Sequence, residues 1–144
     1  MEIAVNCRFA VIVLLLAVSI ISCGIMEEIE PDGTWIGQTA TTGTGKAGLF
    51  KDTWTFKDGN ITSDSGAEYT YTVDATKKPK LIDITMGLPV ADKRVRMGIY
   101  KIEKDTLTIC HVITNKAKAD ARRPEEFDTT KRDDVVVLTF RKKK

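Results

Sequence analysis

The sequence is poor in the residues that enzyme and metal sites use most often. Its 144 residues include one histidine, His111, and three cysteines. A metal site needs three or four ligands at a recognisable spacing, and a serine hydrolase needs a nucleophile elbow together with a histidine and a carboxylate. Ser63 and Ser65 lie in a predicted turn that has no such elbow. The sequence therefore predicts no catalytic residue, no metal ligand and no cofactor, and the protein is expected not to be an enzyme.

The chain also lacks an excess of charge of either sign. Its net charge is +2, and lysine and arginine alternate with aspartate and glutamate along most of its length. Nucleic-acid binding needs a basic face, so this balance does not indicate a nucleic-acid partner. The one basic cluster is the run Arg141–Lys144. A solvated chain end is the favoured interpretation of this run, ahead of contact with an anionic lipid surface.

Only one long apolar run is present, and it lies near the N-terminus. Residues Phe9–Ile21 are apolar except for Ser19, and they follow Arg8. The run is shorter than the roughly 20 residues that a membrane-spanning helix needs. Its length and its position fit the apolar part of a secretory signal peptide instead.

The end of this run, Ile20-Ile21-Ser22-Cys23, resembles the bacterial lipobox, in which a small residue precedes a cysteine that becomes lipidated. The pattern predicts a lipoprotein signal peptide over residues 1–22, then the lipidated Cys23 and an acidic tether over residues 23–32, and a domain over residues 33–144. The protein is then extracytoplasmic and held to a membrane by its N-terminal lipid, at the outer membrane or the periplasmic face in a Gram-negative host. An ordinary signal peptide or an uncleaved anchor that ends in cysteine is the alternative.

Cysteine use has a consequence for stability. With Cys7 removed and Cys23 lipidated, Cys110 is left alone, so no internal disulfide is expected. The domain must then be stabilised by a packed core. Cys110 is predicted to be a small buried residue of that core, and His111 a hydrogen-bonded residue at its edge.

No segment after Cys23 has the periodicity of a long helix, whereas strand signals recur throughout. The clearest is the stretch from Gly98 to Cys110, which is typical of two alternating strands joined by a tight turn. Asp58-Gly59 is a strong hairpin signal, and the Thr/Gly-rich residues 41–48 are predicted to be a loop without a nucleotide role. Alternation predicts inward side chains at Phe50, Trp54, Phe56, Tyr69, Tyr71, Val73, Ile82, Ile84, Leu107, Ile109, Ile113, Val136, Leu138 and Phe140, and Phe127 is expected to cap this core. Such short strands with turn signals between them predict an all-β sandwich or barrel.

Several short pieces of this pattern occur in a characteristic order. They are Gly33-Thr34-Trp35, Lys78–Thr85, Gly98-Ile99-Tyr100, Asp105–Cys110, Arg123–Phe127 and Leu138–Arg141. Together they resemble the lipocalin-like domain family of bacterial proteins of the planctomycete type. The resemblance implies a small antiparallel lipocalin-like (calycin-type) barrel or half-barrel of about seven to eight strands, and it implies no activity. The chain differs from the family pattern at Lys104, where a glycine is usual, so Asp105 is expected to take the left-handed conformation of the turn.

The resemblance also suggests two sets of site residues. In calycins, the tryptophan of the first strand closes one end of the barrel, often with a basic residue across its ring. Trp35 is expected to be this barrel-end plug, with Arg141 or Arg123 over it by a cation–π contact. The candidate residues for lining a ligand pocket are the aromatic residues that alternation places inward: Trp54, Phe56, Tyr69, Tyr71 and Tyr100.

The sequence thus favours a lipid-anchored, extracytoplasmic β-barrel that acts as a binding or interaction module. Its partner would be a small apolar molecule or a protein of the cell envelope. A structural envelope lipoprotein without a small-molecule ligand is the alternative, and a hydrolase acting on envelope substrates is less well supported. An eight-stranded barrel has an interior just wide enough to be filled by side chains or to hold one small ligand, and a filled interior is expected here.

Overall fold

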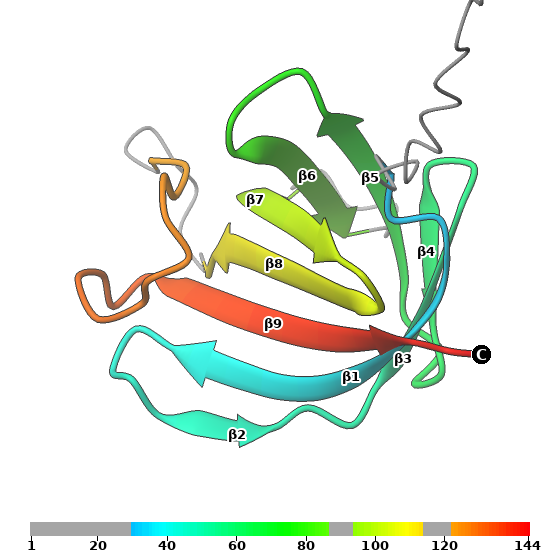
Figure 1. Ribbon diagram of the computed structural model, residues 1–144, viewed down its shortest axis with the longest axis horizontal. Coiled ribbons are helices and arrows are strands. Elements are labelled where there is room, and N and C mark those ends of the chain that lie inside the picture. Colours follow the sequence, from blue (N-terminus) through cyan, green and yellow to red (C-terminus); the bar gives the residue numbers. More distant parts are fainter. Residues whose placement is uncertain (1–29, 87–93, 114–121) are drawn as a thin grey trace, which may run out of the picture.

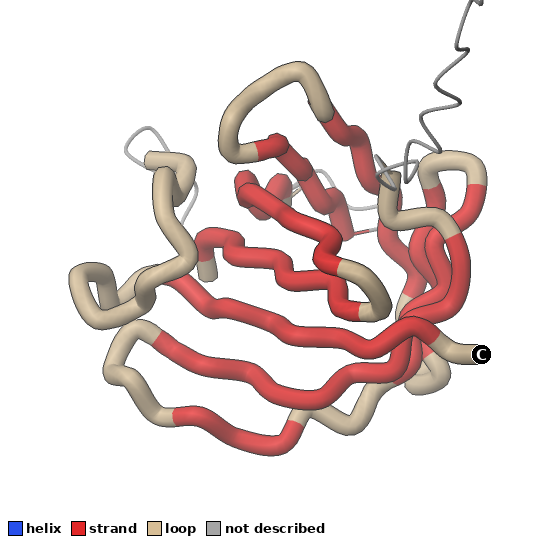
Figure 2. Tube along the Cα trace, viewed as in Figure 1, coloured by secondary structure: helices blue, strands red, loops and turns tan. Residues whose placement is uncertain are grey.

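The computed structural model describes residues 30–86, 94–113 and 122–144. The predicted signal peptide and the predicted lipidation site Cys23 lie outside these ranges. Every long regular element within them is a β-strand, as Figure 2 shows. This part of the chain has no helix of the length and hydropathy that would cross a membrane.

The described residues form one antiparallel sheet of nine strands (Figure 1). The strands are β1 (Gly33–Thr42), β2 (Ala47–Leu49), β3 (Thr53–Lys57), β4 (Asn60–Ser63), β5 (Glu68–Asp74), β6 (Lys80–Met86), β7 (Val95–Glu103), β8 (Thr106–Val112) and β9 (Val135–Lys142). Their order in the sheet is β2-β1-β3-β4-β5-β6-β7-β8-β9, and β1 also pairs with β9. Apart from β2, each strand thus lies between two others, and the predicted all-β barrel is confirmed.

Strand β1 closes the barrel because different parts of it have different neighbours. Its first residues, Gly33–Ile36, pair with β3. Residues Trp35–Thr42 pair with β9, with a shift of register between Gly37 and Thr39. Residues 39–41 pair with the short strand β2 on the other side. The result is a closed eight-stranded barrel with β2 as an additional strand, rather than a half-barrel.

Of two hairpin turns, one has the conformation that the sequence predicts and the other does not. At the β3–β4 turn, Asp58 (φ 51°) and Gly59 (φ 77°) both have positive φ values, in agreement with the predicted Asp-Gly turn. At the β7–β8 turn, the left-handed residue is Lys104 (φ 55°), not Asp105. The register pairs Glu103 with Thr106, which makes Lys104 the first of the two loop residues. This position requires the positive φ, and Lys104 adopts it although it has a side chain.

The interior of the barrel is a continuous hydrophobic core. Thirteen of the fourteen inward positions that alternation predicts belong to it, with Phe50, Tyr69 and Val73 only partly buried. The exception is Ile113, which follows the end of β8 and is 39% exposed. Trp35, Leu107, Ile109 and Phe140 are fully buried. The strand register inferred from the sequence is therefore correct on this face.

A second, smaller cluster lies on the outside of the barrel wall. Ile99, Cys110 and Val135 are buried there, and Phe127 and other partly buried side chains pack against them. Phe127 was expected to cap the main core. It packs against the outer face instead, because the segment before β9 runs along the outside of the wall.

The residues predicted as a loop, 41–48, include the end of β1 and most of β2. All three residues of β2 are exposed, so this strand has no buried face and no alternation of apolar and polar residues. Only the pairing of backbone groups with β1 defines it as a strand.

Candidate binding groove

The five aromatic residues proposed to line a ligand pocket pack against one another inside the barrel. Trp54, Phe56, Tyr71 and Tyr100 are buried, and Tyr69 is partly buried. The ring of Trp54 lies 5.6 Å from that of Tyr69 and 6.1 Å from that of Phe56, centroid to centroid. Phe56 meets Tyr71 edge to face at 5.2 Å. These rings occupy the volume that an apolar guest would need.

The polar atoms of these aromatic residues also have partners within the fold. The Nε1–H of Trp54 donates a hydrogen bond to Oδ2 of Asp52 at 2.8 Å. The hydroxyl of Tyr71 donates to Oδ1 of Asp32 at 2.9 Å, and burial together with this carboxylate raises the pKa of Tyr71 above its usual range. Burial raises the pKa of Tyr100 to about 12. Both hydroxyls are thus neutral at physiological pH.

Trp35 lies fully buried near the end of the barrel where residues 30–32 enter. Its Nε1–H donates a hydrogen bond to the carbonyl oxygen of Pro31 at 2.7 Å. The cation over its ring is Lys142, whose Nζ lies 5.4 Å from the ring centroid. Arg141 does not take this role, because neighbouring residues of a strand point to opposite faces and Arg141 is exposed. Arg123 lies on the outer wall instead, where it pairs with Asp83.

The adjacent residues Cys110 and His111 are both buried in β8. Burial raises the pKa of the Cys110 thiol to about 11, which keeps it protonated and unreactive. The imidazole of His111 faces the interior, where Nδ1 lies 3.1 Å from the carbonyl oxygen of Val112. Burial lowers its pKa to about 4, so the ring is neutral in the folded protein. The part of the chain that the structure describes contains no group of three or more potential metal-ligating residues.

A groove lies on the outside of the barrel because β6 begins short of the end of its neighbour β7. The pairing of β6 with β7 stops at Lys80 and Tyr100, whereas β7 continues to Glu103. Two adjoining hollows, of about 510 and 460 Å³, fill the space between the β5–β6 turn and the segment before β9, and they share Lys77, Lys78 and Pro79. We call this the outer groove; it is lined by Ala75, Lys77–Leu81, Ile99–Glu103, Arg122–Glu125 and Phe127.

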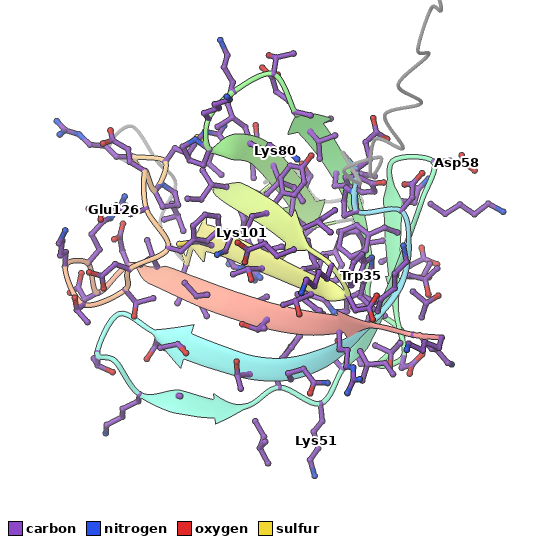
Figure 3. All side chains as sticks on the ribbon, in the orientation of Figure 1. Trp35, Lys51, Asp58, Lys80, Lys101 and Glu126 are labelled. Atoms are coloured by element: carbon purple, nitrogen blue, oxygen red, sulfur yellow. The ribbon has the colours of Figure 1, made fainter. Side chains whose placement is uncertain are left out.

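The outer groove combines positive charge with apolar surface. Six of the residues that line it are lysine or arginine and two are glutamate, which makes it electropositive. Figure 3 shows Lys80 and Lys101 on the adjacent strands β6 and β7. Lys101 pairs with Glu103 at 2.9 Å, and its Nζ lies 5.3 Å from the ring centroid of Phe127. Within the described ranges, no carboxylate forms an ion pair with the exposed Lys77 or Lys78.

Arg123 holds the far wall of the outer groove in place. Its Nη1 donates hydrogen bonds to the carbonyl oxygens of Gly98 at 2.7 Å and Ile82 at 3.3 Å. The same nitrogen lies 2.6 Å from Oδ1 of Asp83 on β6. Arg123 therefore fixes the segment before β9 against β6 and β7. The positive charge of Arg123 is thus balanced within the fold. The charged side chains that can contact a ligand are mainly the lysines of the opposite wall.

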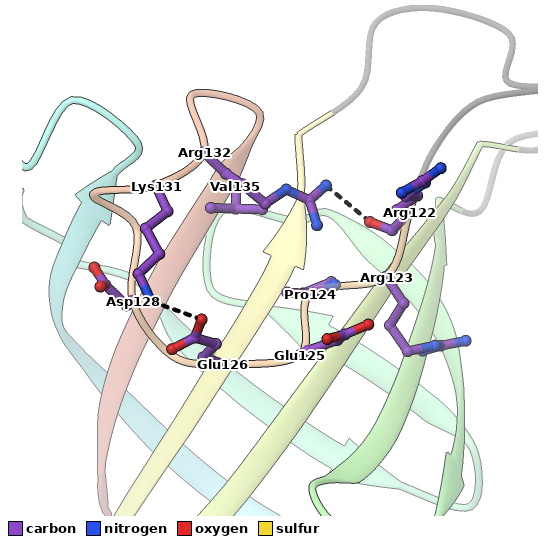
Figure 4. Close-up of a pocket in the computed structure, with 9 residues that line it drawn as sticks. All are labelled: Arg122, Arg123, Pro124, Glu125, Glu126, Asp128, Lys131, Arg132 and Val135. Carbon is purple, nitrogen blue, oxygen red and sulfur yellow. Dashed lines mark hydrogen bonds and ion pairs between the residues drawn. The ribbon is translucent and has the colours of Figure 1, made fainter.

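A smaller cleft of about 150 Å³ lies behind this wall, within the segment that connects to β9 (Figure 4). Its charges are largely paired. Nζ of Lys131 lies 2.9 Å from Oε1 of Glu126, and Nη2 of Arg132 lies 2.7 Å from Oδ2 of Asp134. Arg132 also donates a hydrogen bond to the carbonyl oxygen of Arg122 at 2.8 Å. These contacts order the segment, and they leave less uncompensated charge here than in the outer groove.

No family model, curated protein or solved structure matches this chain. The function of the protein is therefore inferred from its own surface.

The sequence alone does not reveal the outer groove, because the run Lys77-Lys78-Pro79-Lys80 predicts only a turn. The role of this run depends on two facts that alternation does not reveal: β6 begins at its last residue, and Arg123 brings a distant segment alongside it. The density of lysines next to proline was the one available signal.

Proposed function

We propose that this protein is a lipid-anchored, extracytoplasmic binding module that uses the outer groove, and not the barrel interior, to bind an acidic segment of another envelope protein. The contrast between the two spaces supports this proposal. Packed aromatic rings fill the interior, whereas the outer groove has exposed lysines above an apolar floor. The two hollows share Lys77, Lys78 and Pro79, so a single bound segment would contact both.

The chemistry of the groove defines the partner. Its carboxylates would lie beside Lys77 and Lys78, which form no ion pair among the described residues, and its apolar side chains would pack on the partly buried Pro79, Leu81 and Phe127. Electrostatic complementarity of this kind contributes mainly to specificity and to the rate of association. Binding is therefore expected to weaken as the salt concentration rises.

Reversing the charge of one wall tests the site. A fluorescent peptide that alternates glutamate with leucine is titrated into the chain that begins at Gly24. The barrel and its core lie within residues 33–142, so this chain retains them all. The double variant Lys77→Glu/Lys78→Glu should bind the peptide about tenfold more weakly, since each exposed charge contributes up to about 1 kcal/mol.

The matched control is Lys46→Glu/Lys51→Glu, which makes the same charge change at exposed residues that flank β2. It should leave the affinity nearly unchanged. Equal weakening in both variants would show that binding follows net charge and that the outer groove is not the site.

The filled interior gives a second expectation. A fluorescent fatty-acid analogue titrated into the same chain should bind weakly or not at all, because the aromatic rings leave little room beside them. Saturable one-to-one binding at submicromolar concentration that is lost in Trp54→Ala would instead identify the protein as a carrier of apolar molecules.

The anchor is tested separately. Cys23→Ala should leave the full chain without an acyl group, so that it is either not processed or soluble after export. The measurement is the intact mass of the native protein and of the variant, isolated from a bacterial host. A native protein without the mass of a diacylglycerol group would refute the lipid anchor.

A further inference from the structure

We propose that the end of the barrel that the tether enters docks on anionic phospholipid headgroups of the membrane that holds the anchor. The contact surface is a basic collar, which we define as Lys57, Lys104, Arg141, Lys143 and Lys144. This inference rests on the proposed lipid anchor, and it adds an orientation: the closed end of the barrel faces the membrane.

The first observation is where the chain enters the barrel. The carbonyl of Pro31 accepts a hydrogen bond from Trp35, and Asp32 accepts one from Tyr71, so the end of the tether is fixed at the closed end. Cys23 precedes Glu30 by seven residues. A stretch of this length spans at most about 25 Å, which keeps the closed end near the surface in which the lipid is inserted.

The second observation is that the basic C-terminal run is held at this same end. The backbone N–H of Lys143 donates to the carbonyl oxygen of Thr34 at 2.9 Å, and that of Lys142 donates to Asp105 at 2.8 Å. Figure 1 shows the start of the described chain and the C-terminus on the same side of the molecule. The run is therefore part of the surface around the tether and not a remote tail.

The neighbouring turns add to this charge. Lys57 ends β3, which pairs with the start of β1, and Lys104 lies in the β7–β8 turn beside β9; both are exposed. Asp58 and Asp105 lie in the same two turns, and Glu30 and Asp32 lie where the tether enters, so four carboxylates offset much of the charge. The five positive side chains of the collar exceed these four carboxylates, and three of the five, Arg141, Lys143 and Lys144, lie together in the C-terminal run.

A membrane surface fits this collar better than a compact partner does. The cations come from two turns and the C-terminal run around one end of the barrel, an arrangement that suits an extended layer of phosphates. Attraction between basic residues and anionic lipids acts only within a Debye length, about 8 Å at physiological ionic strength. The short tether supplies the proximity that this weak attraction needs.

The test uses the chain that begins at Gly24, so that no lipid contributes. At low ionic strength it should co-sediment with vesicles that contain phosphatidylglycerol, and not with vesicles of phosphatidylcholine alone. The variant Lys143→Glu/Lys144→Glu should lose about tenfold in vesicle affinity, because it reverses two charges at the proposed contact. Both residues are exposed and follow the last strand, so the barrel is retained.

Two further variants make the result specific. Lys46→Glu/Lys51→Glu should bind vesicles like the native chain. The proposal is overturned if this control loses as much affinity as Lys143→Glu/Lys144→Glu, if only Lys77→Glu/Lys78→Glu loses it, or if the native chain does not bind. Acylation of Cys23 and peptide binding in the outer groove are measured independently of these vesicles, so failure of the collar leaves the proposed function standing.

Discussion

Replacing Trp35 with alanine should lower the free energy of unfolding by about 3–5 kcal/mol, the range found when a large aromatic side chain is removed from a packed core. Trp35 is fully buried at the closed end of the barrel. Its loss leaves a cavity, removes the ring beneath Lys142 and leaves the carbonyl of Pro31 without its donor. The measurement is urea or thermal denaturation of the chain that begins at Gly24.

The matched control for this change is the next residue. Ile36→Ala also removes a large apolar side chain, but Ile36 points outward and is 39% exposed. It should cost less than Trp35→Ala by at least about 2 kcal/mol, because only partly buried surface is lost. Similar costs for the two variants would mean that the inward and outward faces of β1 are assigned the wrong way round.

Acidification should destabilise the protein through His111. Its pKa is about 4 in the folded state against 6.5 for an unperturbed histidine, because the ring is buried. Between these two values, only the unfolded chain binds the proton. Stability is therefore lost as the pH falls from about 6.5 to about 4, and this one group accounts for up to about 3 kcal/mol. Arg96 lies close enough to disfavour the charged imidazole further.

Two measurements separate His111 from the carboxylates that also titrate in this range. His111 is the only histidine, so a single ring-proton signal in NMR reports its protonation. That signal should stay constant down to about pH 5, and a titration near 6.5 would contradict the assigned burial. Unfolding of His111→Leu should also depend less on pH between 6.5 and 4 than unfolding of the native chain.

Much of the barrel was predictable because its interior obeys a simple rule. Strands such as β3 and β6 alternate apolar and polar residues, as in Trp54 and Phe56 or Ile82 and Ile84, and the apolar face of these strands is the inner one. The same rule identifies Lys142 as the residue over Trp35, since it continues the inward series of Leu138 and Phe140. Alternation in the sequence therefore favours Lys142 over Arg141.

Other features depend on how distant segments meet, and no local pattern contains them. Strand β2 has no buried face, so it has no alternation to detect. Phe127 is apolar whether it caps the interior or lies on the outer wall, and the hydrogen bonds of Arg123 decide between the two. The outer groove arises from this same contact together with the start of β6 at Lys80, short of the end of β7.

The pairing of β1 with β9 also determines the order in which the strands of the sheet can pair during synthesis. The two strands are separated by about a hundred residues, and the entropy lost in closing so long a loop makes such pairings form late. Until residues 135–142 are available to pair, both β1 and β8 lack the neighbour that β9 provides and would expose unpaired backbone groups. Such edges favour pairing with other chains. We therefore expect the growing chain to be prone to aggregation until β9 closes the sheet into a barrel.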